Sequence, residues 1–127
     1  MSTTVRLSGA NNQDNTGANL LHDFQEKAYA ASVAITVGVN RARTTVRVAQ
    51  ATGALSLTVN VGTSTTGPMV GDELRILASS DATGRVITFS TGFASAGTLT
   101  MVASKKAVAN FVFDGTAWVE TGRSIGA

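Results

Sequence analysis

Residues 108–120 read Val-Ala-Asn-Phe-Val-Phe-Asp-Gly-Thr-Ala-Trp-Val-Glu and form the densest aromatic cluster of the chain. Asp114-Gly115 separates two apolar runs, and this dipeptide readily supplies the positive φ angles that a tight hairpin needs. Phe111 and Phe113 fall on one face of the first run, while the second run carries Trp118, the only tryptophan. The segment therefore predicts a β-hairpin whose large side chains hold a core together, which indicates a structural role.

Outward from this hairpin, apolar and polar residues alternate with a period of two. The sharpest case is Leu55-Ser56-Leu57-Thr58-Val59-Asn60-Val61, whose two faces separate completely. The predicted strands cover residues 33–39, 44–48, 55–61, 73–79, 85–90, 98–103, 107–113 and 117–121. Short strands separated by glycine or polar turns, with no alternation of strands and helices, predict an all-β fold. We expect an antiparallel β-sandwich or a jelly-roll-like domain.

The spacing of apolar residues differs in the first part of the chain. Leu20, Leu21, Phe24 and Ala28 recur at helical spacing, and Thr16 is a suitable cap, so one short helix is compatible with this region. The same residues are equally compatible with an extended arm. We therefore expect an N-terminal arm over residues 1–31 and a β-sandwich domain over residues 32–127.

Composition limits the classes of function. Charged residues make up 14% of the 127 residues, against roughly 25% in typical domains. A surface short of charge is poorly protected against association, so we expect contacts with other subunits or partners. A net charge of +2 without a long basic run does not indicate nucleic acid. No window reaches the roughly eighteen apolar residues that a membrane helix needs, so no membrane partner is expected.

The chemistry-bearing residues do not predict an enzyme, a metal site or a cofactor. His22 is the only histidine and has no nucleophile motif near it, and cysteine is absent. The polar run 11–15 lacks the spacing of a calcium loop, and residues 62–67 lack the lysine ending of a phosphate loop. The carboxylates Asp72 and Asp114 are explained by turns, and Asp114 is expected to accept a hydrogen bond from Thr116.

Two positive patches are candidate partner contacts. Arg41, Arg43 and Arg47 form the denser patch, and Lys105-Lys106 forms the second. No aromatic residues are interleaved with the arginines, as a single-strand nucleic-acid platform would require. The patch is therefore interpreted either as a contact with an acidic partner surface or as a solvated loop.

The aromatic residues leave one further alternative. Trp118 or Phe93 could serve as a stacking platform in a carbohydrate-binding module. Aromatic residues at alternating positions beside a hairpin are, however, more often part of a core, so a small-molecule ligand is not the first expectation.

Several segments together resemble a pattern in small structural proteins of tailed bacteriophages. These segments are Gly71-Asp72-Glu73-Leu74-Arg75-Ile76-Leu77, then Val86-Ile87-Thr88-Phe89-Ser90-Thr91-Gly92-Phe93, then Gly97-Thr98-Leu99, and finally residues 111–120. Arg123-Ser124 stands where that pattern has a Ser/Arg-containing tail. The resemblance covers about residues 54–124. The sequence departs from the pattern at Ser90, where glycine is usual, and at Ala117-Trp118, where paired aromatics are frequent.

The resemblance implies a virion structural protein without enzymatic activity. We expect a capsid decoration (cement) protein, made in the host cytoplasm and bound to the outer surface of the head. The implied partners are the major capsid protein and further copies of the chain itself, as a homotrimer. A head-fibre, tail-fibre or adhesin component is the alternative within the same family.

Overall fold

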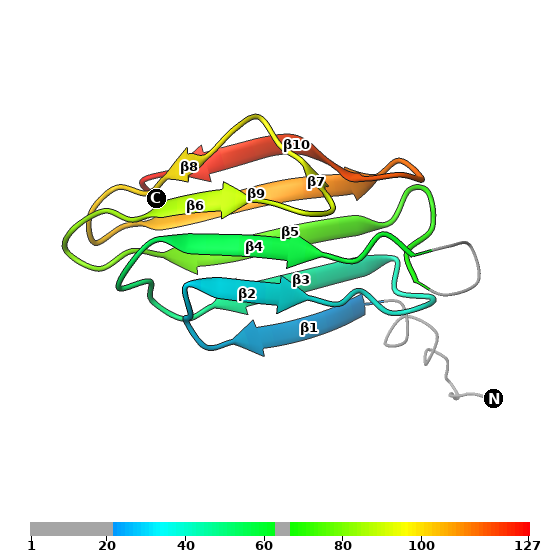
Figure 1. Cartoon of the computed structure of the whole chain (residues 1–127), viewed down its shortest axis with the longest axis horizontal. Helices are drawn as coiled ribbons and strands as arrows, with labels where there is room; N and C mark the ends of the chain where they lie inside the picture. The colour runs from blue at the N-terminus through cyan, green and yellow to red at the C-terminus, as the bar shows by residue number, and fades with distance from the viewer. Residues whose placement is uncertain (1–21, 63–66) are drawn as a thin grey trace.

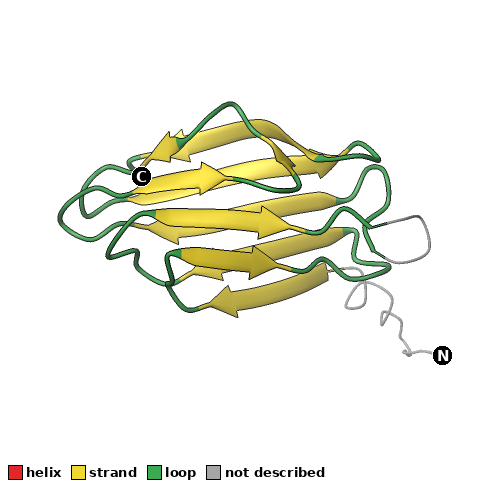
Figure 2. Ribbon diagram, in the orientation of Figure 1, coloured by secondary structure: helices red, strands yellow, loops and turns green. Residues whose placement is uncertain are grey.

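The computed structural model describes residues 22–62 and 67–127, and the described part is built from β-strands and loops (Figure 2). The strands are β1 (His22–Lys27), β2 (Ser32–Ile35), β3 (Arg43–Val48), β4 (Leu55–Val59), β5 (Glu73–Ser79), β6 (Val86–Phe89), β7 (Phe93–Ala94), β8 (Leu99–Thr100), β9 (Lys106–Phe113) and β10 (Trp118–Ile125). The expectation of an all-β fold is confirmed. This part of the chain holds no helix of the length and apolar character needed to cross a bilayer.

The strands form two facing sheets. Sheet A has six strands in the order β1-β3-β5-β9-β10-β7, and sheet B has four in the order β2-β4-β6-β8. Figure 1 shows the four strands of sheet B lying over sheet A, with β1 and β2 running in opposite directions. Two sheets that face each other around one core are consistent with a β-sandwich.

The expected antiparallel pairing is wrong for the first half of the fold. From β1 to β6 the chain crosses to the other sheet after every strand, so successive strands of one sheet are parallel. The turns of this coil differ in length, since His22 pairs with Arg43, whereas Arg43 pairs with Glu73. Antiparallel pairs occur only where β9 meets β5 and β10 and where β8 meets β6, within the described residues.

The short helix considered for the N-terminal region is contradicted where the structure describes it. His22–Lys27 forms β1, which pairs with β3 along its whole length. Sheet A therefore begins before residue 31, where the arm was expected to end. Thr16, Leu20 and Leu21 lie outside the described residues, as does the rest of the arm up to residue 21. Tertiary pairing has here overridden a local helical spacing.

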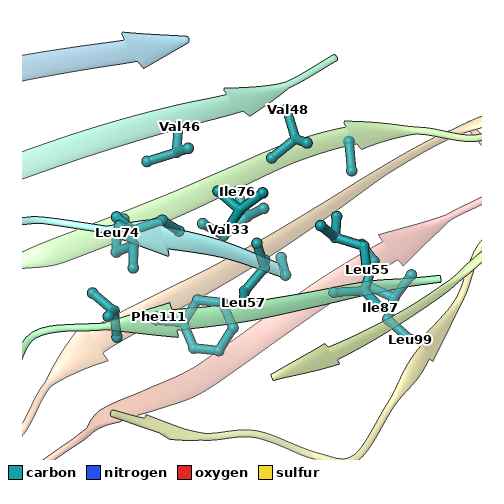
Figure 3. Close-up of a cluster of buried hydrophobic side chains, with 14 of the residues drawn as sticks. Val33, Val46, Val48, Leu55, Leu57, Leu74, Ile76, Ile87, Leu99 and Phe111 are labelled. Atoms are coloured by element: carbon teal, nitrogen blue, oxygen red, sulfur yellow. The ribbon is translucent and has the colours of Figure 1, made fainter. Parts of the chain in front are cut away.

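The core lies between the two sheets and is supplied by alternate residues of the strands (Figure 3). Leu74 and Ile76 of β5 and Phe111 of β9 project from sheet A, and Leu55 and Leu57 of β4 project from sheet B. Burying each such side chain stabilises the fold by about 1.5–3 kcal/mol. The alternation that predicted strands thus also sorts each strand into a core face and an outer face.

The hairpin at residues 108–120 is present. β9 and β10 pair antiparallel, with Phe113 opposite Trp118, and the connecting loop covers residues 114–117. Asp114 Oδ1 accepts hydrogen bonds from the Thr116 N–H at 2.8 Å, the Thr116 hydroxyl at 3.0 Å and the Ala117 N–H at 2.9 Å. These bonds lower the pKa of Asp114, the one from the Thr116 N–H most. The predicted bond from Thr116 is confirmed, and Gly115 has a φ of 103°.

Candidate functional site

The outer faces of the two sheets differ in chemistry. The outward positions of sheet B carry only small or hydroxylated side chains and one valine: Ser32, Ala34, Ser56, Thr58, Val86, Thr88 and Thr100. The outward positions of sheet A carry most of the charge of the described strands. They include His22, Glu26, Arg43, Arg47, Glu73 and Arg75. The outer face of sheet B is therefore uncharged along its strands, whereas that of sheet A carries charged side chains together with exposed apolar ones such as Phe24 and Val119.

The structure divides the first predicted positive patch. Arg43 and Arg47 both point outward from β3 and are more than half exposed. Arg43 lies 3.8 Å from Glu73, and Arg47 lies 2.8 Å from Glu26. Arg41 sits in the loop before β3 and is half-buried, so it is not one of the exposed strand positions. Exposed ion pairs contribute roughly 0–1 kcal/mol, so a partner can displace them at little cost.

The second patch lies elsewhere. Lys106 begins β9 and pairs with Ser79 at the end of β5, whereas Arg43 pairs with Glu73 at its start. Lys105 and Lys106 are exposed, and the carbonyl of Lys106 accepts main-chain bonds from Gly126 and Ala127. The structure therefore does not bring the lysines together with Arg43.

A shallow groove of about 450 Å³ crosses the outer face of sheet A beside Arg43. Its polar lining comes from five neighbouring strands and consists of His22, Arg43, Thr44, Thr45, Glu73, Arg75, Asn110 and Thr121. The Arg75 Nε–H donates to Asn110 Oδ1 at 2.9 Å, and His22 Nε2 lies 3.4 Å from Thr45 Oγ1. Apart from Arg43, sequence reasoning missed this set. The residues alternate correctly along each strand, but only the register between strands places them side by side.

The register explains why the groove forms there. His22, Arg43, Glu73 and Val112 occupy one row across sheet A. In the next row Thr45, Arg75, Asn110 and Gly122 follow one another, and the register of β10 shifts between Glu120 and Gly122. This β-bulge leaves glycine, which has no side chain, in the second row. The row is therefore open at its β10 end.

The stacking platform considered for Trp118 or Phe93 is contradicted for Trp118. Its side chain is 0% exposed, its indole N–H donates to the carbonyl of Asn60 at 3.0 Å, and its ring lies 5.2 Å from that of Phe113. Phe93 is half-buried and packs 4.9 Å from the ring of Phe111. A ligand cannot reach the indole of Trp118 in this structure.

An ion pair closes the side of the core next to β10. Glu120 and Arg123 form two short bonds, of 2.6 and 2.7 Å, and the Glu120 side chain is only 4% exposed. Arg123 also donates to the carbonyls of Gly97 and Thr98, at 3.0 Å each. The Arg123 guanidinium and, to a smaller extent, the Ala96 N–H lower the pKa of Glu120. These hydrogen bonds hold the loop before β8 against β10, so the ion pair has a structural role.

The described titratable residues include no candidate metal centre. Across residues 22–62 and 67–127, three or more histidine or carboxylate side chains are nowhere grouped as metal ligands would be. Asp81 is held by Arg85 through bonds of 2.9 and 2.8 Å, which lower the pKa of Asp81. The groove on sheet A is the candidate site, and its residues can bind a ligand.

Comparison with known protein families and with curated protein sequences finds no family model and no curated protein that matches this chain.

Proposed function

We propose that this protein is a structural component of a tailed-bacteriophage virion, and that it acts as a decoration (cement) protein on the outer surface of the capsid. The proposal begins from the segments that carry the resemblance. Leu74 of the first segment pairs with Phe111 of the last, and Phe93 of the second pairs with Trp118. Phe89 of the second segment lies 5.2 Å from Phe111, ring to ring. Segments far apart in sequence thus meet in one packed unit, as a fold signature should.

The observation that carries the proposal is the uncharged outer face of sheet B. A cement protein must bury area against a shell, and every buried charge that lacks a partner costs free energy. Ser56 and Thr58 on the central strand β4, with Thr88 beside them on β6, can be covered without that cost. We therefore place the contact with the major capsid protein on this face, and the charged face of sheet A outward.

The second partner in the proposal is the chain itself. Most oligomers of identical chains have closed symmetry, and the resemblance to phage structural proteins implies a homotrimer. β1 and β2 lie at the same end of their sheets and leave an unpaired edge in each, as far as the described residues show. Such edges offer main-chain groups to a neighbouring copy.

Binding to expanded phage heads that lack this protein tests the proposal. We expect the purified chain to co-sediment with such heads, to have the mass of a trimer, and to raise the temperature at which the heads open. Thr58→Lys places a charge on the face of sheet B and should weaken head binding. Thr45→Lys is the matched control, since it adds the same charge to the face of sheet A. Failure of the unaltered chain to bind any head preparation would contradict the proposal.

A further inference from the structure

The groove on sheet A has a built-in surplus of positive charge. Arg43 and Arg75 line it together with a single carboxylate, that of Glu73. Glu73 is 3.8 Å from Arg43, which is long for a charge-assisted hydrogen bond. An incoming anion therefore competes with only one loosely held partner.

The guanidinium of Arg75 is held in one orientation but still has donors that lack an acceptor among the described residues. Its Nε–H is fixed by Asn110 Oδ1 at 2.9 Å, while no described residue accepts a hydrogen bond from its two terminal nitrogens. A guanidinium held in this way presents a planar fork of donors, and a carboxylate fits that fork with two parallel bonds. Arg75 thus suits a carboxylate or a phosphate group, and the rest of the lining distinguishes the two.

The rest of the lining suits a ligand rich in hydroxyl groups. Thr45 and Thr121 carry hydroxyls, Glu73 accepts hydrogen bonds, and the side-chain amide N–H groups of Asn110 have no acceptor among the described residues. Glu73 repels a doubly charged phosphate more strongly than a singly charged carboxylate, and a sugar brings several more hydroxyls that can donate to Glu73. The volume of about 450 Å³ lies within the range of small-ligand sites, roughly 300–1,000 Å³.

An exposed aromatic ring borders the same groove. Phe24 is 57% exposed and pairs directly with Thr45, which lines the groove. A phenyl ring left in solvent beside polar groups offers a flat apolar surface to the C–H face of a sugar ring. The combination of a carboxylate fork, hydroxyl partners and a stacking ring is characteristic of acidic carbohydrate recognition.

An acidic peptide suits the groove less well. Extended peptides bind sheets by adding a strand to an open edge, where main-chain groups are unpaired. The strands β3, β5 and β9 beneath the groove are each paired on both sides. A peptide on this face would find no main-chain partner, whereas a sugar needs none.

We propose that this groove binds an acidic glycan, with a sugar carboxylate on the guanidinium of Arg75 and the sugar ring against Phe24. The proposal does not depend on the capsid function, because it concerns the opposite face of the molecule. On a virion with sheet B against the shell, the groove would face the surroundings. The residues that the glycan meets are His22, Thr45, Glu73, Asn110 and Thr121.

The test uses the full chain and NMR titration with two probes of equal length, trigalacturonic acid and the neutral maltotriose. We expect the acidic probe to shift amide signals of β1, β3, β5 and β9 around the groove, and the neutral probe to bind at least about tenfold more weakly. Arg75→Gln should weaken binding of trigalacturonic acid by about tenfold or more. Arg47→Gln is the matched control, since Arg47 lies on the same face but outside the groove.

Three outcomes would overturn the proposal. The first is the absence of shifts in the groove with the acidic probe. The second is an equal loss in the two arginine variants, which would indicate general charge attraction. The third is tighter binding of a glutamate-rich peptide than of trigalacturonic acid, which would make the ligand a protein. Head binding through sheet B is measured separately, so neither proposal depends on the other.

Discussion

Asn60 holds Val37 through both of the main-chain groups of that residue. Asn60 Oδ1 accepts a hydrogen bond from the Val37 N–H at 2.7 Å, and Asn60 Nδ2 donates to the Val37 carbonyl at 2.9 Å. Val37 follows β2 and Asn60 follows β4, so this amide continues the pairing of the two strands beyond their ends. The carbonyl of Asn60 also accepts the indole N–H of Trp118, which links sheet B to sheet A.

Asn60→Ala should therefore lower the free energy of unfolding by about 2–4 kcal/mol, because it leaves two main-chain groups at the buried Val37 without partners. Urea unfolding followed by the fluorescence of Trp118 measures this loss. Asn60→Asp keeps the acceptor for the Val37 N–H but places a carboxylate against a carbonyl, so it should also destabilise the fold. An alanine variant as stable as the unaltered protein would show that water replaces both bonds.

Gly92 is expected to tolerate no side chain. Its φ is 94°, and a Cβ atom there would collide with the carbonyl oxygen of Val59. Gly92→Ala should cost about 2 kcal/mol or more, since backbone strain of about 1–3 kcal/mol is added to the collision. Gly71 has a similar φ of 96° with open space around it, so Gly71→Ala isolates the strain alone. Equal losses in the two variants, measured by thermal unfolding, would show that the collision is relieved.

The ion pair of Glu120 and Arg123 should make stability depend on pH. The pKa of Glu120 is lowered from its usual 4.5 in the folded protein, so its contribution is present above that value and is lost as the pH falls through the folded pKa. Glu120→Gln should destabilise the protein at neutral pH by about 1.5–3 kcal/mol, and the difference between the two proteins should shrink as the solution becomes acidic. Urea unfolding between neutral pH and acid measures it. A difference that stays constant with pH would contradict this assignment.

Trp118 should report on the core and not on ligands. Its burial predicts a blue-shifted emission and weak quenching by acrylamide in the folded state. Addition of an acidic oligosaccharide should leave this emission unchanged, since the groove lies on the outer face of sheet A. A large change at constant stability would place the ligand near Trp118 instead.

The sequence predicted single strands far better than their partners. Residues 73–79 were expected as a strand and form β5, because alternation along one strand depends only on which face is buried. β1 was missed because His22–Lys27 is mostly polar and becomes extended by pairing with β3. The direction of pairing was also missed, because alternation with one exposed face is typical of antiparallel sheets, whereas in this fold parallel strands alternate in the same way. The groove could not be predicted for the same reason. Arg75 and Asn110 are neighbours because of the register between β5 and β9, which the sequence does not reveal.

In the coil of β1–β6, the strands differ in how many neighbouring strands support them. Among the described strands, β1 pairs with β3 alone and β2 with β4 alone, whereas β9 pairs with β5 on one side and with β10 on the other. Amide hydrogen exchange should accordingly slow progressively from β1 toward β9, as in arrays where each layer depends on its neighbour. Duplicating one turn of this coil would add one strand to each sheet, while the hairpin of β9 and β10 keeps its place between β5 and β7.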